Sequence, residues 1–156
     1  MNALMTAIVT WIAANFGLPA TYDHPEIAFA SAVEITIVRY QAFSPEKRRA
    51  AIAAYDIAAQ TDKPRQVVAI YDHRRKLILL SKEWTGRSAA ELSVLVHELV
   101  HHLQNVAGLI YECPSAREKL AYAAQEKWLG LFGRSLSDEF DIDPFTLKVS
   151  TECGFQ

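Results

Sequence analysis

Apolar side chains recur at helical spacing in two long stretches of the chain. Over residues 3–16 they return every three or four positions until Gly17, which predicts a helix with one face in the core. Over residues 92–106 they form a broader face, which begins after the capping-box pattern Ser88-x-x-Glu91 and ends near Gly108. Both stretches are therefore predicted to be helices with a buried face.

The segments around these helices predict a small sheet and further helices. Two β-rich runs, residues 66–71 and 76–80, flank a short turn, which is a hairpin pattern. Residues 25–30 are expected to be extended, and Asp143-Pro144 to turn the chain near its end. Helices are predicted over residues 31–43, 46–60 and about 114–132. With no repeat, linker or low-complexity segment, this order predicts a single α+β domain, mainly helical, with a small β-hairpin before the second long helix.

The helix over residues 92–106 carries the candidate chemistry, because it contains His97-Glu98-x-x-His101. Positions four apart on an α-helix lie nearly one above the other, so both imidazoles can reach one Zn²⁺ ion. Glu98 is next on the helix surface and can contact a water bound to that ion, which is the place of a general base. Two histidines and a glutamate among valines and leucines would be costly to desolvate without a partner. The motif therefore predicts a site for one zinc ion.

The third protein ligand of such a site has to come from elsewhere in the chain. A catalytic zinc has three protein ligands and an open position. No third histidine follows at metzincin spacing, where Gln104 stands three positions after His101. The next predicted helix offers Glu118 and Glu126, both within reach of an antiparallel neighbour. Glu118 has an alternative role, since Ser115-x-x-Glu118 is itself a capping-box pattern. The residues alone leave the two glutamates as alternatives.

The motif, a short loop and a helix with Glu118-x-x-Ala121-Tyr122 together resemble the gluzincins, the thermolysin-like class of zinc peptidases. Small zincin-like bacterial proteins, largely of unassigned function, are similar over about residues 84–128. The resemblance implies a minimal zincin-like domain spanning residues 1–156, with one Zn²⁺ ion as the cofactor. It also implies that the metal is held by His97, His101 and Glu118 and that Glu98 is the general base.

Two departures from the gluzincin pattern limit what the resemblance implies. Tyr122 stands where gluzincins often carry an aspartate that supports a metal histidine, and the chain is too short for the second lobe that supplies most of the substrate cleft. We therefore keep three hypotheses. The first is a zinc metallopeptidase or related amide hydrolase acting on a peptide or protein substrate. The second is a zinc-binding protein without proteolytic activity, or a latent enzyme activated by a partner. The third is a helical interaction domain without a metal, in which hydrogen bonds satisfy the histidines.

Several further residues are candidates for supporting roles. A developing oxyanion needs a donor beyond the ligands, and the candidates are Tyr111, His73, His24 and Arg117. The interactions left open are those of Tyr122 (with a metal ligand or in the core), His102 (at the surface or beside a ligand), and Gln104 and Gln125 (between the two helices or in solvent). Residues 76–80 resemble the zincin edge strand, on which an extended peptide substrate would be laid.

Composition and charge argue against some classes of protein and leave the compartment open. The 156 residues carry a net charge of −2 without an extended Lys/Arg cluster, so nothing indicates an electrostatic nucleic-acid footprint. The apolar run over residues 3–16 is too short to span a bilayer and lacks the basic residues expected before a signal-peptide core. Cys113 and Cys153 are either two buried thiols or a single disulfide. A disulfide would favour an extracytoplasmic location, periplasmic or secreted after signal removal, over a cytoplasmic one. The oligomeric state is open.

Overall fold

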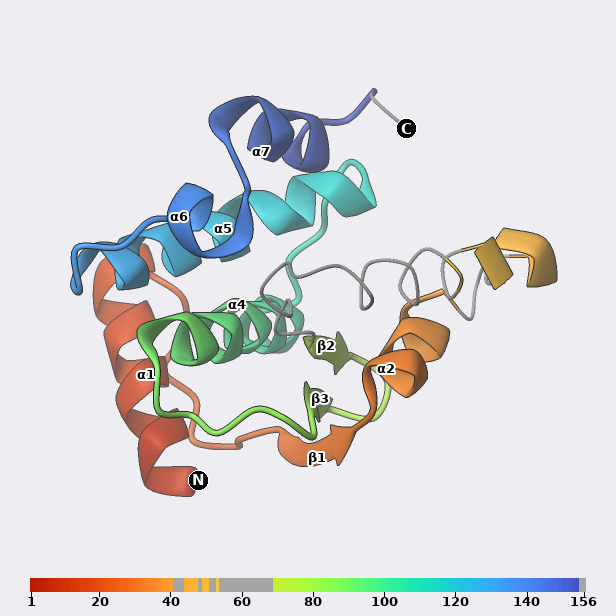
Figure 1. Ribbon diagram of the computed structural model, residues 1–156. Helices are drawn as coiled ribbons and strands as arrows, with labels where there is room; N and C mark the ends of the chain where they lie inside the picture. Colours follow the sequence, from red (N-terminus) through yellow and green to blue (C-terminus); the bar gives the residue numbers. More distant parts are fainter. Residues whose placement is uncertain (41–43, 48, 51–52, 54–68, 155–156) are drawn as a thin grey trace.

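The computed structural model describes residues 1–40, 44–47, 49–50, 53 and 69–154 of the chain (Figure 1). The helices are α1 (Asn2–Phe16), α2 (Ala32–Arg39), α4 (Ala89–Val106), α5 (Pro114–Gly130), α6 (Leu136–Phe140) and α7 (Pro144–Thr151), and the strands are β1 (Glu26–Ala30), β2 (Ala69–Asp72) and β3 (Leu77–Ser81). These elements confirm the predicted α+β class, mainly helical with a small sheet before the helix that carries the motif. Residues 45–47, 49–50 and 53 are helical, and the rest of the helix predicted over residues 46–60 lies outside the described residues.

The three strands form one sheet in the order β1-β3-β2. β2 and β3 are antiparallel, which confirms the predicted hairpin, although residues 66–68 of the predicted first strand lie outside the described residues. β1 pairs in parallel with the other side of β3, with Glu26 opposite Leu77. The hypothesis that residues 76–80 form an edge strand is therefore wrong. The physical reason is the nearly continuous apolar run of β3, which suits a central strand, and Ile78 and Leu80 are fully buried.

Helix α4 is the central element of the fold. It packs against α5 on one side, against β2 on another and against α1 along a third, so that the sheet and the other two long helices surround it (Figure 1). Every residue from Ser93 to Gln104 is buried as a result. The core around α4 is made of apolar side chains from α1, β3 and α4 itself, including Ile8, Ile12, Ile78, Leu95, Leu99 and Leu103. The motif His97-Glu98-x-x-His101 consequently lies on a helix that is covered on most of its circumference.

The start of α4 is fixed by the capping box that the sequence predicts. Ser88 Oγ accepts a hydrogen bond from the Glu91 backbone N–H, and the Glu91 carboxylate accepts bonds from the backbone N–H groups of Thr85, Arg87 and Ser88. The indole N–H of Trp84 donates to the Glu91 carbonyl at 2.8 Å. The Glu91 side chain thus connects the loop before α4 to the first turn of that helix.

Replacing Glu91 with glutamine is expected to lower the free energy of unfolding at pH 7 by about 1 kcal/mol, the usual worth of a helix cap. Burial alone would raise the pKa of Glu91, but hydrogen bonds from Thr85, Ser88 and Arg87 outweigh it and lower the pKa from 4.5 to about 2. A depressed folded-state pKa stabilises the fold above about pH 4.5, and this contribution is lost as the pH falls from 4.5 towards 2. Denaturant titrations at several pH values should show the difference between the wild type and the variant shrinking over that window. A difference that does not change with pH would contradict the argument.

The C-terminal part of the chain folds back over α5. Asp143 caps α7 by accepting a hydrogen bond from the Thr146 backbone N–H, and Pro144 occupies the first turn of that helix. A disulfide joins Cys113, which immediately precedes α5, to Cys153 at the end of α7, so the possible disulfide is present. The bond closes a sequence separation of 40 residues and holds α7 beside the start of α5. No helix among the described residues combines the length and the apolar character needed to cross a membrane.

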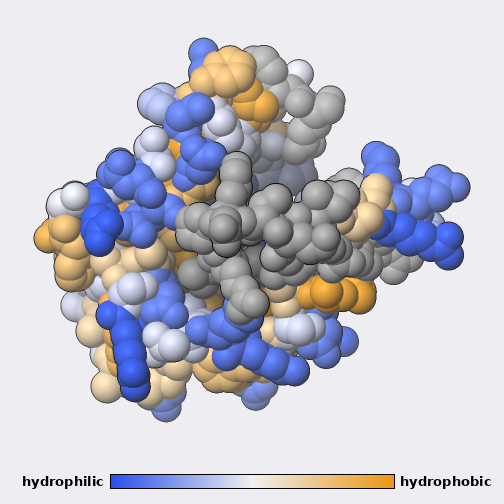
Figure 2. Space-filling model, viewed as in Figure 1, coloured by the Kyte–Doolittle hydropathy of each residue, from blue (hydrophilic) through white to orange (hydrophobic). Residues whose placement is uncertain are grey.

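The face of the molecule seen in Figure 2 mixes hydrophilic and apolar side chains. Such mixing is ordinary, because apolar atoms contribute much of the accessible surface of folded proteins. Among the described residues, the largest exposed fractions of large apolar side chains belong to Ile110 at 97% and Phe145 at 75%, which lie in the loop after α4 and on α7.

Candidate metal centre

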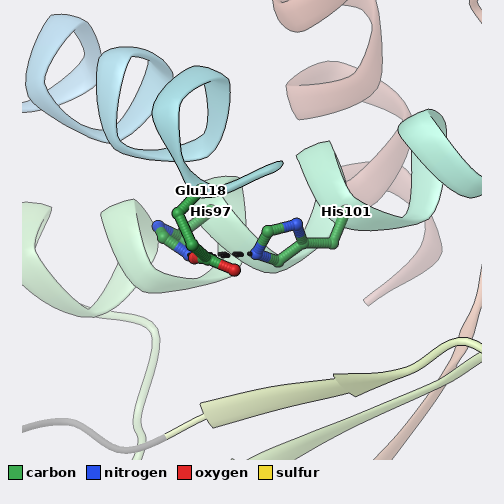
Figure 3. Close-up of side chains that lie close together, drawn as sticks. All are labelled: His97, His101 and Glu118. Atoms are coloured by element: carbon green, nitrogen blue, oxygen red, sulfur yellow. Dashed lines mark hydrogen bonds and ion pairs between the residues drawn. The ribbon is translucent and has the colours of Figure 1, made fainter. Parts of the chain in front are cut away.

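Three side chains on α4 and α5 point at one another (Figure 3). His97 Nε2 lies 3.1 Å and His101 Nε2 lies 3.3 Å from Glu118 Oε2, and the two Nε2 atoms are 3.2 Å apart. A tetrahedron around a zinc ion with bonds of about 2.0–2.1 Å has edges of about 3.3–3.4 Å. The three observed separations are close to that edge length. The residues therefore fit one face of a tetrahedral metal site, and the remaining corner is the one a substrate or water would take.

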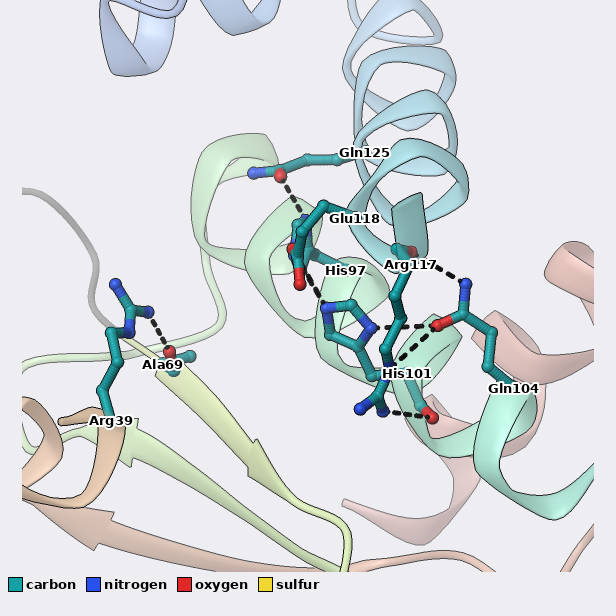
Figure 4. Close-up of polar contacts among 8 residues, drawn as sticks. All are labelled: Arg39, Ala69, His97, His101, Gln104, Arg117, Glu118 and Gln125. Carbon is teal, nitrogen blue, oxygen red and sulfur yellow. Dashed lines mark hydrogen bonds and ion pairs between the residues drawn. The ribbon is translucent and has the colours of Figure 1, made fainter. Parts of the chain in front are cut away.

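The protonation of His101 follows from its neighbours. Gln104 donates its amide N–H to the Arg117 carbonyl at 3.0 Å, and Arg117 Nε donates to Gln104 Oε1 at 3.4 Å (Figure 4). Since a carbonyl only accepts and a guanidinium only donates, the amide of Gln104 has one possible orientation. Its Oε1 lies 3.0 Å from His101 Nδ1, so Nδ1 must carry the proton and donate. The lone pair of neutral His101 consequently sits on Nε2, the atom that faces Glu118.

The same argument applies to His97. Ser93 Oγ donates its proton to the Ala90 carbonyl at 2.7 Å, so it accepts from the amide nitrogen of Gln125 at 3.2 Å. Gln125 Oε1 is thereby turned towards His97 Nδ1, at 3.0 Å, and accepts its proton. In the neutral form of each histidine, the lone pair therefore lies on Nε2, the atom that faces the Glu118 carboxylate. Gln104 and Gln125 bridge α4 and α5, and the alternative that they are solvated is wrong.

The electrostatics of the centre favour a positive charge between these three side chains. Burial would raise the pKa of Glu118, but hydrogen bonds with His101 and His97 hold it well below its usual range. Burial would lower the pKa of His101, but the carboxylates of Glu118 and Glu98 raise it above the usual value. When both imidazoles are neutral, two lone pairs and a carboxylate oxygen at about 3 Å repel one another unless a metal ion or a proton lies between them. A metal ion satisfies all three acceptors at once, whereas a proton satisfies two.

On the expectation that the cluster holds zinc, replacing Gln125 with leucine should weaken zinc binding by about 10–100-fold, the usual effect of removing the hydrogen-bond partner of a metal histidine. Gln125→Glu should restore most of the affinity, because a carboxylate also accepts the His97 Nδ1 proton. Competition with a chromophoric chelator measures the dissociation constants, and Asn15→Leu, which removes an amide from α1, is the control for a general loss of stability. Equal zinc affinity in the wild type and in Gln125→Leu would contradict the assigned tautomer.

The described residues line a pocket of about 540 Å³ beside the three candidate ligands. Its wall includes Glu98, and the same residue also lines a second, smaller pocket of about 130 Å³. Four residues border both pockets, namely Arg39, His97, Glu98 and Tyr122. Glu98 is 6% exposed and lies where the two pockets adjoin, so its side chain is accessible from the pocket beside the candidate ligands.

Glu126, the alternative third ligand, has another role. Its carboxylate accepts the backbone N–H of Leu136 at 2.6 Å and so holds the start of α6. Helix α5 begins at Pro114 with Cys113 as its N-cap, so Ser115 lies inside the first turn and the capping-box alternative for Glu118 is not realised. Of the two glutamates, the structure brings Glu118 to the histidines.

Among the candidates for a supporting role, Tyr122 is the one whose ring contacts the cluster. Its ring packs edge-on against the His97 ring, with centroids 4.7 Å apart. Burial raises the pKa of Tyr122, and the nearby Glu118 carboxylate adds to that effect, so its hydroxyl stays protonated. Arg117 lines the larger pocket but uses its guanidinium to hold Gln104 and the His101 carbonyl.

Three candidate oxyanion donors do not line either pocket. His73 is exposed in the turn between β2 and β3, and Tyr111 lies in the loop before α5. His24 lies 2.8 Å from the Thr6 hydroxyl of α1. The sequence identified these three residues only by their chemical type. The fold does not bring them to the pockets beside the motif.

His102 is neither at the surface nor beside a ligand, which corrects the sequence-based expectation. It is fully buried, with Nδ1 3.1 Å from the Tyr71 hydroxyl and Nε2 2.9 Å from the Asp23 carbonyl. Because that carbonyl only accepts, Nε2 donates and Nδ1 accepts from Tyr71. Burial lowers the pKa of His102, so it is held neutral. The residue fastens β2 and the segment before β1 to α4.

Arg39 at the end of α2 is a pocket residue that the sequence does not identify. It lines both pockets, and its Nη2 donates to the Ala69 carbonyl at the start of β2, at 2.8 Å (Figure 4). It is far from the motif in sequence, and no local pattern relates α2 to α4. Only the packing of α2 beside β2 brings the guanidinium to this position.

Comparison with known proteins places the chain in a family without assigning an activity. Residues 41–156, which include α4, α5 and all three candidate ligands, match the family described as a domain of unknown function, DUF6647. No curated protein and no solved structure matches the chain. The match covers well over half of the 156 residues, and the chain therefore belongs to the DUF6647 family.

Proposed function

We propose that this protein is a zinc-dependent metallopeptidase, or a closely related amide hydrolase, of gluzincin-like type. The observation that carries the proposal is the convergence of two histidine lone pairs and one carboxylate oxygen at about 3 Å, with both tautomers fixed by glutamine amides. His97, His101 and Glu118 would hold one zinc ion. Neutral imidazoles and a carboxylate in a tetrahedral arrangement with an open corner are the donor set of catalytic zinc.

Glu98 is the general base of the proposed reaction. When bound, zinc supplies the chemistry by polarising the carbonyl of the substrate and by lowering the pKa of a bound water to near 7. Glu98 accepts the proton of that water and delivers it to the departing amine. Its position at the junction of the two pockets supports this role, because substrate bound across the junction passes beside its carboxylate. Tyr122 borders the same junction and keeps its hydroxyl proton available for donation.

An extended peptide is the substrate that the surroundings of the site favour. The larger pocket is bordered by Ile70 and Tyr71 of β2, which pairs only with β3 among the described residues. A peptide laid along β2 would use backbone hydrogen bonds in the manner of strand addition. In this proposal, β2 takes the role of the substrate-binding edge strand that was expected at residues 76–80.

The disulfide supports an oxidising compartment as the place where the protein acts. Such bonds form and persist in secreted and periplasmic proteins and are rare where thiols are kept reduced. The Cys113–Cys153 bond holds α7 beside the start of α5, and Ser150 of α7 contributes to the wall of the larger pocket. We therefore propose an extracytoplasmic location.

Metal analysis combined with a peptide digest tests the proposed function. The purified protein should contain one zinc per chain, cleave members of a mixed peptide library, lose this activity with a chelator and regain it on addition of zinc. Cleavage sites are identified by mass spectrometry. One bound zinc without any cleavage would support the alternative of a zinc-binding protein without proteolytic activity or a latent enzyme. Failure to bind zinc would overturn the proposal.

A further inference from the structure

We propose that Arg39 binds a carboxylate group of the substrate next to the bond that is cleaved, an inference that rests on the proposed function. The substrate class is then a peptide with either a free C-terminal carboxylate or an acidic side chain beside the scissile bond. The placement of Arg39 is the first support. Of the four residues that border both pockets, His97 is a candidate ligand, Tyr122 packs against it and Glu98 is the proposed base. Arg39 is the fourth and lies across from the cluster (Figure 4).

The hydrogen bonds of Arg39 leave most of its guanidinium for a ligand. A guanidinium has five N–H donors in a planar fork. Among the described residues, the structure gives Arg39 one hydrogen bond, from Nη2 to the Ala69 carbonyl, and no ion pair with a carboxylate. That bond directs the exposed side chain towards the start of β2 and leaves its other N–H groups free of partners among the described residues. Arg117, the other arginine of the larger pocket, is bonded to Gln104 and to the His101 carbonyl.

The charge of the larger pocket also favours an anionic substrate. Its charged lining among the described residues consists of two arginines and two glutamates, so these side chains cancel. A divalent metal held by the cluster would leave the pocket with a net positive charge. Glu118 faces the metal and Glu98 the attacking water, which leaves no described carboxylate beside Arg39. A carboxylate of the substrate supplies the missing partner, and charge-assisted bonds to an arginine fork are the strongest of their kind.

Binding of zinc-chelating probes to the zinc-loaded protein tests this inference without relying on turnover. The probes are the mono-hydroxamate of succinic acid and its neutral carboxamide, which share the zinc-binding group and differ only in the carboxylate. Isothermal titration calorimetry at pH 7 should give at least about tenfold tighter binding of the acid, the effect of one charge-assisted contact. Arg39→Met should remove this preference, and Arg39→Lys should keep part of it. The zinc content of each variant checks that the site is intact.

Arg87→Met is the matched control, since Arg87 is exposed before α4 and lines neither pocket. It removes one positive charge and should leave the preference for the acid unchanged. Equal binding of the acid and the carboxamide to the wild type, or a preference that survives in Arg39→Met, would overturn the role of Arg39 while leaving the metal site standing. Failure of both hydroxamates to bind the zinc-loaded protein would overturn the proposed function as well.

Three extended probes separate the two sources of the carboxylate. The succinyl hydroxamate is coupled to alanine with a free C-terminus, to alanine amide and to glutamic acid amide. Tighter binding of the free alanine form than of both amides, lost in Arg39→Met, identifies recognition of a chain end. Tighter binding of the glutamic acid amide identifies recognition of an acidic side chain. Equal binding of all three would contradict a carboxylate contact at this position.

Discussion

Glu98→Gln is expected to lower the rate of peptide hydrolysis by about 10²–10⁴-fold, the usual contribution of a general base, while the protein keeps its zinc. The glutamine side chain has nearly the same size and shape, so the junction of the two pockets should be preserved. Its amide cannot accept the proton of the attacking water. Glu98 is not among the three candidate ligands, and for this reason its replacement should spare metal binding.

The measurement compares kcat/KM and zinc content for the wild type and the variant on a peptide identified in the library digest. Glu26→Gln is the control, because Glu26 is exposed on β1 and lines neither pocket. That variant should keep both its zinc and its activity. Undiminished hydrolysis by Glu98→Gln would show that the base is another group. Loss of zinc would show instead that Glu98 is a ligand, contrary to the arrangement proposed for the cluster.

Glu118→Ala is expected to weaken zinc binding by more than about a hundredfold, because even the hydrogen-bond partners of metal ligands are worth about 10–100-fold. The loss of zinc affinity should be larger than that from removing the hydrogen-bond partner of a ligand. The reason is that the variant also leaves two Nε2 lone pairs facing one another without an anion. Competition with a chromophoric chelator gives the affinity, and elemental analysis of the purified variant gives the occupancy.

Glu126→Ala is the matched control, on the same helix and with the same chemical change. It should bind zinc as the wild type does and lose about 1 kcal/mol of stability, because the Leu136 backbone N–H loses its acceptor. The two variants should therefore have different defects. Glu118→Ala loses zinc affinity, whereas Glu126→Ala loses stability. Zinc loss in Glu126→Ala with retention in Glu118→Ala would reverse the assignment of the third ligand.

The elements that the sequence predicts well are those set by interactions within one helical turn. The predicted capping box of Ser88 with Glu91 forms, and Gly17 ends α1 in the left-handed conformation. A cap needs only its own helix, so its pattern is visible in four consecutive letters. The hairpin of β2 and β3 is local in the same sense.

The errors concern contacts between elements that are far apart in the chain. The strand over residues 76–80 is central because β1 pairs with it across some fifty positions of sequence. His102 is buried because Tyr71 and the Asp23 carbonyl meet it from two other segments. In both cases the neighbouring residues in the chain are compatible with the expected arrangement and with the observed one. The local sequence therefore could not decide between them.

For the candidate site, the sequence by itself determined the pair His97 and His101 and the place of Glu98. A helix with a four-residue spacing must bring two side chains to one side. Only the tertiary structure decided that Glu118 completes the cluster, that Gln104 and Gln125 fix the two tautomers, and that Arg39 faces them across the pocket. The relative positions of His97, Glu98 and His101 follow from the geometry of one helix, α4. The positions of the residues from other elements depend on how α5, β2 and α2 pack around that helix.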